Sequence, residues 1–322
     1  MARRATFIRD FKRERKELLI LDAGNSLFKA KASPSVAERE KAKLIATAYQ
    51  WMDYQAVNIG SNDLLAGIEF LKGLQKGTYL AFLSANLLDG EGGKPIFKSH
   101  LIVDLKEVRV GIFGLTSDVR QNEGVTPEGY FISDPIAAAK RLTDELTKEC
   151  DIIVALSNLG SLKEYHKLVQ GVEGIHFIIG SGGKGSFRQI IQSNEGWQAL
   201  LFQSYPKGQY LGRIDLKVVK GSHNFVDLGQ KANLERQINS IEKQLDSYRR
   251  GMGRAKSIPL DKREEYIKRL EEYKDRSAVR LKELEKDSRS KSTFINTFIR
   301  LDNKIEEDPE IKELVVRFKK GS

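Results

Sequence analysis

The pattern of apolar and polar positions divides the chain into two regions. From residue 16 to about residue 219, short apolar runs alternate with segments of helical periodicity. Runs such as "LLILDAG", "YQAVNIG", "RVGIFGLT" and "DIIVALSNLG" are rich in β-branched and aromatic residues and are bounded by Gly or Asn. These runs predict buried strands, and their alternation with amphipathic segments predicts an α/β domain. Loops that follow such strands collect at one edge of the sheet, where functional sites form.

A second region with helical periodicity begins near residue 229. Apolar residues recur there at steps of four and three, as in a helix that packs along one partner: Leu234, Ile238, Ile241, Leu245 and Tyr248. Glycines then interrupt the pattern, and Pro259 and Asp261 follow, the latter suited to cap a second helix. Apolar spacing resumes from Ile267 to Leu284 among dense charges. The pattern predicts a coiled-coil-like helical hairpin.

The last segment is expected to return to the body of the protein. "TFINTFIRLDNKI" predicts an extended piece, and "DPEIKELVVRFKK" predicts a helix with Asp308 as its cap and Pro309 at its first position. The predicted organisation is an α/β domain over residues 1–228, followed by a helical hairpin and C-terminal segment over residues 229–320.

Composition narrows the function classes. The net charge is +10, from 54 basic and 44 acidic residues, but the two signs are interspersed, so nucleic-acid binding is not favoured. Cys150 is the single cysteine, which excludes an internal disulfide and a thiolate zinc cluster. No run of about 18 apolar residues and no signal-peptide pattern is present, so this chain is expected to insert into no membrane.

Seven blocks of the sequence, in order, resemble one family. They are "ARRAT" with "LLILDAGNS", "VNIGSNDLLAG", "LSANLL", "VGIFGLTS", "DIIVALSNLG", "IIGSGGK" and "GQYLGRIDL". Together they are similar to the calcineurin-like metallophosphoesterases, in the branch of the 5′-nucleotidases and cyclic phosphodiesterases. The resemblance implies an αββα sandwich that hydrolyses phosphate esters with two metal ions. The family's opening Asp-x-His motif would precede "ARRAT", so the resemblance also implies that this chain lacks the first strand.

The ligand positions that the resemblance implies hold other residues here. The family's bridging Asp falls on Asn25, its metal-binding Asn on Ser61 and the neighbouring His on Asn62. A further metal-binding His falls on Asn158, and a final His-x-His pair falls on Gly182 and Lys184. Neutral amide and hydroxyl oxygens hold divalent cations weakly compared with carboxylate and imidazole, and Lys184 adds a positive charge. No metal and no catalytic residue is therefore expected.

Two acidic residues near these positions leave an alternative open. Asp22 and Asp63, with Asn25, are weak candidates for a rebuilt single-metal centre. The structural interpretation, which we favour, is that Asp22 fixes its turn and Asp63 caps the following helix. "GSGGKGS" from Gly180 resembles an anion-binding loop but lacks the spacing of a P-loop, so a turn is favoured.

The sequence thus predicts a catalytically inactive phosphoesterase-like scaffold or interaction protein without cofactors. The alternative is a residual 5′-nucleotidase-like phosphoric ester hydrolase that uses Mn or Zn and ligands from missing N-terminal residues. The hairpin is expected to bind a protein partner or another part of a longer chain, with Tyr248, Tyr266 and Tyr273 as possible contacts. Nucleic-acid binding by the hairpin is a third hypothesis, which predicts steep salt dependence. The family resemblance implies a periplasmic or cell-surface origin.

Overall fold

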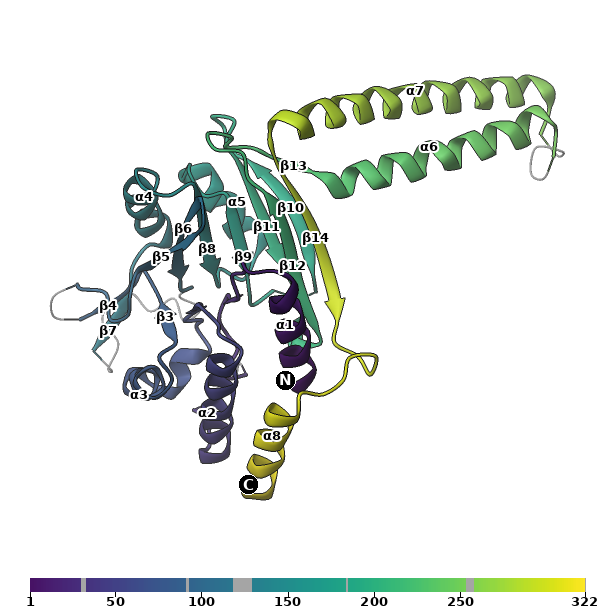
Figure 1. Ribbon diagram of the computed structural model, residues 1–322. Coiled ribbons are helices and arrows are strands. Elements are labelled where there is room, and N and C mark those ends of the chain that lie inside the picture. The colour runs from purple at the N-terminus through teal and green to yellow at the C-terminus, as the bar shows by residue number, and fades with distance from the viewer. Residues whose placement is uncertain (30–32, 91–92, 118–128, 184, 253–257, 322) are drawn as a thin grey trace. The chain divides into compact units, whose positions relative to one another are not determined.

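The computed structural model describes residues 1–29, 33–90, 93–117, 129–183, 185–252 and 258–321 (Figure 1). The chain folds into two compact units: Met1–Gly212 with Phe298–Ser322 form unit 1, and Arg213–Thr297 form unit 2. Unit 2 is therefore inserted into the chain of unit 1. This division falls at residue 213, whereas the sequence pattern placed a boundary at 229, and it assigns the C-terminal segment to unit 1.

The larger sheet of unit 1 has six strands. Its four central strands are parallel and its two edge strands are antiparallel to their neighbours. The spatial order is β10 (Phe187–Gln192), β11 (Gln198–Gln203), β9 (Phe177–Gly180), β8 (Ile152–Ser157), β6 (Val108–Leu115) and β5 (His100–Leu105). All six residues of β8 are buried, as expected for a central strand covered on both faces.

Two helices cover one face of this sheet. They are α4 (Pro135–Leu146) and α5 (Leu162–Gly171), and both lie beside β6 and β8 in Figure 1. Asp134 caps α4, since its side chain accepts a hydrogen bond from Ile136 N, and Ser161 caps α5 in the same way through Glu164 N. The apolar sides of α4 and α5 form one core cluster with inward-facing residues of β6, β8, β9 and β11.

The second sheet of unit 1 is smaller and parallel. It consists of β1 (Leu21–Asp22), β2 (Ala56–Asn58) and β3 (Ala81–Leu83). A separate two-stranded antiparallel sheet pairs β4 (Leu87–Asp89) with β7 (Tyr130–Ile132). A second core cluster joins these strands to α1 (Ala2–Glu14), α2 (Val36–Trp51) and α3 (Ile68–Thr78). The last helix, α8 (Pro309–Gly321), adds Ile311 to this cluster. On their inner side, β2 and β3 approach β6.

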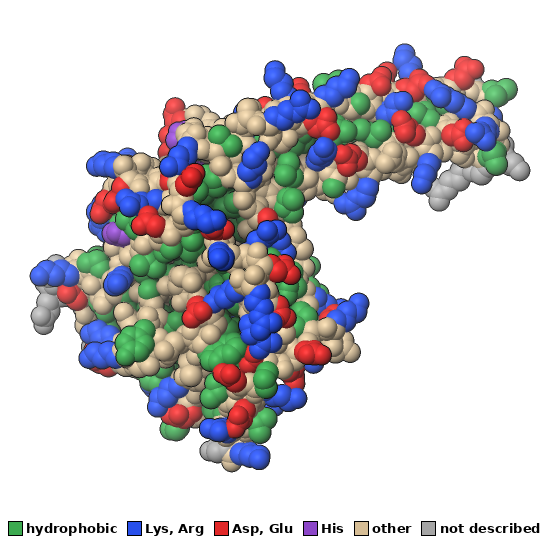
Figure 2. Space-filling model, viewed as in Figure 1, with side chains coloured by type: hydrophobic (Ala, Val, Ile, Leu, Met, Phe, Trp, Pro, Cys, Tyr) green, Lys and Arg blue, Asp and Glu red, His purple; other side chains and the backbone are tan. Residues whose placement is uncertain are grey.

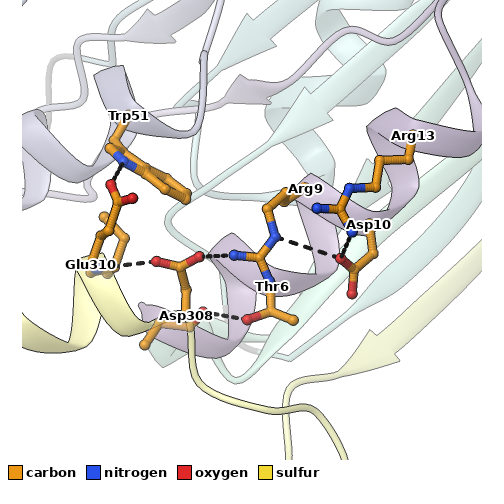
Figure 3. A network of polar contacts seen from close by, with 9 residues as sticks. Thr6, Arg9, Asp10, Arg13, Trp51, Asp308 and Glu310 are labelled. Carbon is orange, nitrogen blue, oxygen red and sulfur yellow. Dashed lines mark hydrogen bonds and ion pairs between the residues drawn. The ribbon is translucent and has the colours of Figure 1, made fainter.

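Helix α8 docks on α1 and α2 through polar contacts as well as apolar ones (Figure 3). The buried carboxylate of Asp308 pairs with Arg9 and also accepts a hydrogen bond from Ile311 N at 3.1 Å, which caps α8. Trp51 Nε1 donates to Glu310 at 2.7 Å. The predicted cap and the predicted first position, Asp308 and Pro309, are thus confirmed.

Unit 2 consists of a helical hairpin and a small sheet. The hairpin pairs α6 (Leu228–Arg249) with α7 (Leu260–Ser290). The strands of the sheet lie in the order β12 (Tyr210–Lys217), β14 (Ser292–Arg300) and β13 (Phe225–Asp227). Strand β14 confirms the extended piece that was predicted for the first part of "TFINTFIRLDNKI". The chain enters unit 2 within β12 and leaves it within β14.

Two local features differ from the sequence-based expectations. Helix α1 was not predicted, although residues 2–6 were used in the family resemblance. In addition, α7 begins at Leu260 with Pro259 before it, so Asp261 lies inside the first turn and not at the cap. Proline fixes φ near the helical value and needs no N–H partner, which makes it a suitable residue at this boundary.

Candidate functional site

The turn after β1 brings the first predicted site residues into place. Asp22 accepts a hydrogen bond from Gly24 N at 2.9 Å, so the prediction that Asp22 fixes this turn is confirmed. Gly24 has φ of +93°, and a Cβ there would lie 2.7 Å from the carbonyl oxygen of Asn58 and from Gly60 N. Only glycine fits such a close approach of two backbones. Asn25 follows with φ of 58°, in the left-handed region that asparagine tolerates.

The turn after β2 is bonded to the turn after β1. Asn25 Oδ1 accepts a hydrogen bond from Asn62 N at 2.9 Å. Gly60 leaves room for this contact, because a Cβ at Gly60 would lie 2.2 Å from Asn25 Oδ1. The Asn25 amide oxygen, at the position where the resemblance implies a bridging carboxylate, therefore accepts a hydrogen bond from the backbone of the neighbouring turn.

The turns after β8 and β9 complete the cluster. Asn158 Oδ1 accepts hydrogen bonds from Ser61 N at 2.9 Å and from Ser61 Oγ at 3.0 Å. Asn158 Nδ2 donates to Ser181 Oγ at 3.2 Å, and Ser181 Oγ donates to the carbonyl oxygen of Ala23 at 2.8 Å. A Cβ at Gly182 would lie 2.7 Å from Asn158 Nδ2 and 3.5 Å from Asn25 Nδ2. The edge of the two sheets is thus closed by neutral side chains.

The structure therefore brings together Asn25, Ser61, Asn62, Asn158 and Gly182, although they come from four separate turns. Lys184, the remaining predicted position, lies outside the described residues.

Asp63 is also part of this cluster, in a different role from the predicted one. Its carboxylate accepts backbone hydrogen bonds from Asn25 at 2.8 Å, Leu27 at 3.1 Å and Gly60 at 2.9 Å. It therefore joins the first two turns and does not cap α3, whose N-cap is Gly67. Burial raises the pKa of Asp63 to about 7, against the opposing effect of the three N–H donors.

Comparison with known proteins finds distant relatives of this chain. No protein-family model matches the chain. A snake venom 5′-nucleotidase from Crotalus adamanteus is 23% identical over 283 residues, which cover 77% of this chain and 47% of that protein. A 5′-nucleotidase from Vibrio cholerae is 25% identical over 206 residues, which cover 54% of this chain and 36% of that protein.

Two solved structures share the fold. A 5′-nucleotidase precursor from Thermus thermophilus has a TM-score of 0.63 at 20% identity and covers 99% of this chain and 53% of its own. The calcineurin-like phosphoesterase YfkN from Bacillus subtilis has a TM-score of 0.64 at 15% identity and covers 100% of this chain and 88% of its own. The chain is a distant relative of the 5′-nucleotidases. It spans about half the length of the first curated relatives it matches.

The donor set of this 5′-nucleotidase relative does not fit a pair of divalent cations. The acceptor oxygens of Asn25 and Asn158 both bind N–H groups of the turn at Gly60–Asn62. Within the described part of the chain, no group of three or more His, Cys, Asp or Glu side chains is arranged to hold a metal ion. The described histidine contacts lie elsewhere: His100 contacts Ser99, His166 contacts Gln189, and His176 accepts a hydrogen bond from Ile153 N.

Sequence reasoning missed a polar network that supports the turn at Asp22. Tyr49 donates a hydrogen bond to Asp22 Oδ2 at 2.8 Å, and Arg4 donates to the hydroxyl groups of Tyr49 and Tyr54, each at 3.2 Å. The two tyrosine rings stack with centroids 4.1 Å apart. Burial raises the pKa of both tyrosines, which keeps both hydroxyl groups protonated. The block "ARRAT" was the available signal, since it contains Arg4.

Both oxygens of Asp22 are consequently engaged, one by Gly24 N and the other by Tyr49. Both oxygens of Asp63 accept backbone N–H groups. The alternative of a rebuilt single-metal centre on Asp22, Asp63 and Asn25 would therefore require these hydrogen bonds to break before a cation could bind.

Proposed function

We propose that this chain is a phosphoesterase-like scaffold of αββα type that carries out no metal-dependent hydrolysis and serves as an interaction protein. The observation that carries the proposal is the use of the Asn25 and Asn158 oxygens as acceptors for the Asn62 and Ser61 backbone amides. Two-metal hydrolysis needs paired cations that polarise a phosphoryl oxygen and lower the pKa of an attacking water. The amide and hydroxyl groups of Asn25, Ser61 and Asn158 bind one another or the neighbouring backbone and supply neither function.

The chemistry of the substituted residues supports the same proposal. An amide has no net charge to offset the repulsion between two cations, so Asn25 would hold a cation pair more weakly than a carboxylate would. An imidazole side chain at residue 182 would begin with a Cβ 2.7 Å from Asn158 Nδ2, so a histidine ligand there needs a different local structure. Hydrogen bonds between the turns then join the segments that would otherwise have to hold the metal ions.

A metal titration tests the proposal. The full chain is titrated with Mn²⁺ and separately with Zn²⁺, its melting temperature is followed, and a chromogenic phosphate monoester is added at each concentration. We expect no saturable rise in melting temperature and no turnover above that of buffer with metal, because a ligand that binds only the native state would stabilise it. The Asn25→Ala and Asn158→Ala variants serve as controls.

Turnover that depends on added metal and is lost in Asn25→Ala would overturn the proposal and support the residual phosphoesterase. In that case the enzyme would be a metal-dependent phosphoric ester hydrolase that uses Mn or Zn. Equal turnover in the parent chain and in both variants would indicate a contaminating hydrolase, which a further purification step would remove.

We also propose an exported origin, periplasmic or at a cell surface. The names of three of the relatives, from Crotalus adamanteus, Gloydius brevicauda and Naja atra, describe venom proteins, which supports this localisation. None of the described helices has the length and apolar composition needed to cross a membrane.

A further inference from the structure

The two sides of the α6–α7 seam differ in chemistry. One side carries ion pairs between the helices: Lys231 with Glu285 at 2.9 Å, Lys274 with Glu242 at 3.9 Å, and Arg249 with Glu271. We call this the ion-paired side. These pairs join the two helices, so the acids on this side lie beside bases of the facing helix. Figure 2 shows both signs of charge along this arm of the molecule.

The other side of the seam presents a row of basic and aromatic residues on α7. We call it the basic-aromatic row, and its spacing of four and three residues keeps it on one strip of the helix. All of its members are exposed, including Tyr266 at 42% and Tyr273 at 44%. The row consists of Lys262, Tyr266, Arg269, Tyr273, Arg276 and Arg280.

Contacts with α6 fix the position of this row. Gln237 donates a hydrogen bond to the Tyr273 hydroxyl, and the ring of Tyr248 lies 4.8 Å from that of Tyr266. The α6 residues in line with Gln237, again at steps of four and three, are uncharged: Asn233, Gln237, Ser240, Gln244 and Ser247. Among the described residues of α6, the line that faces the basic-aromatic row therefore contains no acid.

The acids that approach the basic-aromatic row lie on α7 itself, along the side of the row that points away from α6, which we call its outer border. Arg269 pairs with Glu265, and Arg280 pairs with Glu283 at 3.3 Å, with the side chains of all four residues more than half exposed. Arg276 donates to the carbonyl oxygen of Glu272, and neither it nor Lys262 forms an ion pair with any described acid. Exposed pairs of this kind exchange partners at little cost, because each contributes at most about 1 kcal/mol.

We propose that the basic-aromatic row is the docking surface for an amphipathic helix with an acidic face, supplied by another protein. Charge complementarity identifies the occupant: acids at helical spacing on the partner would lie opposite Lys262, Arg269, Arg276 and Arg280. Tyr266 and Tyr273 supply the large, partly apolar contacts that dominate protein interfaces. From residue 262 to residue 280 the row extends about 27 Å, enough for about five turns of a partner helix.

A polyanion fits this surface less well than a helix does. The border acids Glu265, Glu272 and Glu283 repel a phosphate backbone along the whole row, whereas a partner helix can place its own lysines beside them. The proposal rests on the interaction role proposed above. It fails separately from that role, since the metal titration tests the sheet edge and the experiment below tests the hairpin.

The test uses the full chain and a synthetic helical peptide of about three heptads, with glutamates along one side and leucines beside them. Binding is measured by fluorescence anisotropy for the parent chain and for a triple reversal of the row, Lys262→Glu, Arg269→Glu and Arg276→Glu. The matched control reverses Lys268, Lys282 and Lys286 to Glu, which makes the same change in net charge elsewhere on α7. Circular dichroism verifies that both variants stay helical.

We expect the row reversal to weaken peptide binding at least about tenfold, which corresponds to about 1.4 kcal/mol, and the control to weaken it less than about twofold. A Tyr266→Ser, Tyr273→Ser variant, which changes no charge, should also weaken binding. Equal weakening by both charge reversals would overturn the proposal, because it would indicate non-specific attraction. Failure of the acidic peptide to bind, or tighter binding of an oligothymidylate of equal charge, would overturn it as well.

Discussion

The carboxylate of Asp63 shows how a buried acid can be structural and still titrate near neutral pH. Its folded pKa of about 7 lies above the ordinary aspartate value of 3.8. Between these values the native state holds a proton that the unfolded state has released, so the free energy of unfolding falls as pH rises through this window. The stabilisation from protonated Asp63 is complete below pH 3.8 and is lost as pH rises through about 7.

We predict that Asp63→Asn reduces this pH dependence. The variant is expected to be less stable at every pH, by about 1–3 kcal/mol, because an amide cannot accept all three backbone N–H groups. Urea denaturation of both proteins from pH 4 to pH 7.5 measures the difference. Asp10→Asn, at a side chain 57% exposed, is the control and should keep the parental slope. Parallel curves for the parent chain and Asp63→Asn would contradict the assignment of the titration to Asp63.

The sequence predicted which residues lie in the candidate site, but it did not predict the hydrogen bonds that they form. Asn25, Ser61, Asn62 and Asn158 could be located because each follows a strand in a block of recognisable sequence. Their hydrogen bonds could not be predicted, since Asn25 and Asn62 are 37 residues apart and Ser61 and Asn158 are 97 residues apart. The role of Asp63 was wrong for the same reason: local spacing favoured a helix cap, whereas its donors come from two turns that only the folded sheet brings together.

At the scale of elements, the docking of α8 depends on Asp308. This residue has two roles, as partner of Arg9 and as N-cap of α8 (Figure 3). We predict that Asp308→Asn lowers the free energy of unfolding by about 1–2 kcal/mol, because the asparagine keeps the cap but loses the ion pair with Arg9. The loss stays small because the Arg9 side chain, 38% exposed, remains in contact with water. Asp308→Ala removes both interactions and should cost about 1 kcal/mol more.

Chemical denaturation measures these differences, and hydrogen exchange in α8 shows where they act. The control is again Asp10→Asn, which removes exposed pairs with Arg9 and Arg13 and should change stability by less than about 1 kcal/mol. If Asp308→Asn and Asp308→Ala were equally stable, the capping role of Asp308 would be refuted.

Elements with continuous patterns were predictable, and α1 was not. The central strand β8 is a continuous apolar run because both of its faces are covered, whereas the edge strand β10 alternates with exposed residues. Helix α1 has only small or isolated apolar positions that become buried, among them Ala2, Ala5 and Ile8, between several arginines. Its burial depends on Asp308, Tyr49 and Tyr54, which lie far away in sequence, so no local pattern predicts it.

At the scale of the whole molecule, the inserted unit 2 is predicted to be dispensable for the folding of unit 1. Both core clusters of unit 1 are built from residues 2–211 and 311–314. Across the insertion, Val219 N donates to Ser292 Oγ at 2.9 Å, and Asn296 donates to the carbonyl oxygen of Arg213, so β12 and β14 run in opposite directions. A two-residue Asn-Gly turn can therefore replace residues 220–291.

This shortened chain should also carry Phe294→Thr, because the deletion removes β13, which pairs with β14 at the buried Phe294. We expect cooperative thermal unfolding with a midpoint within a few degrees of the parent, as measured by circular dichroism at a wavelength that reports on tertiary structure. The parent chain with Phe294→Thr alone is the control for that substitution. A shortened chain that unfolds without cooperativity would show that unit 2 stabilises unit 1.

The sequence by itself determined the α/β class, the helical hairpin, most strands and helices, and the distant relationship to the 5′-nucleotidases. These features depend on residues that are near one another in the chain or on blocks of recognisable sequence. Only the tertiary structure decided which oxygens of the site face backbone amides, how Arg4 reaches Asp22, and that unit 2 begins at residue 213. Those features depend on hydrogen bonds and packing between segments that meet only after folding.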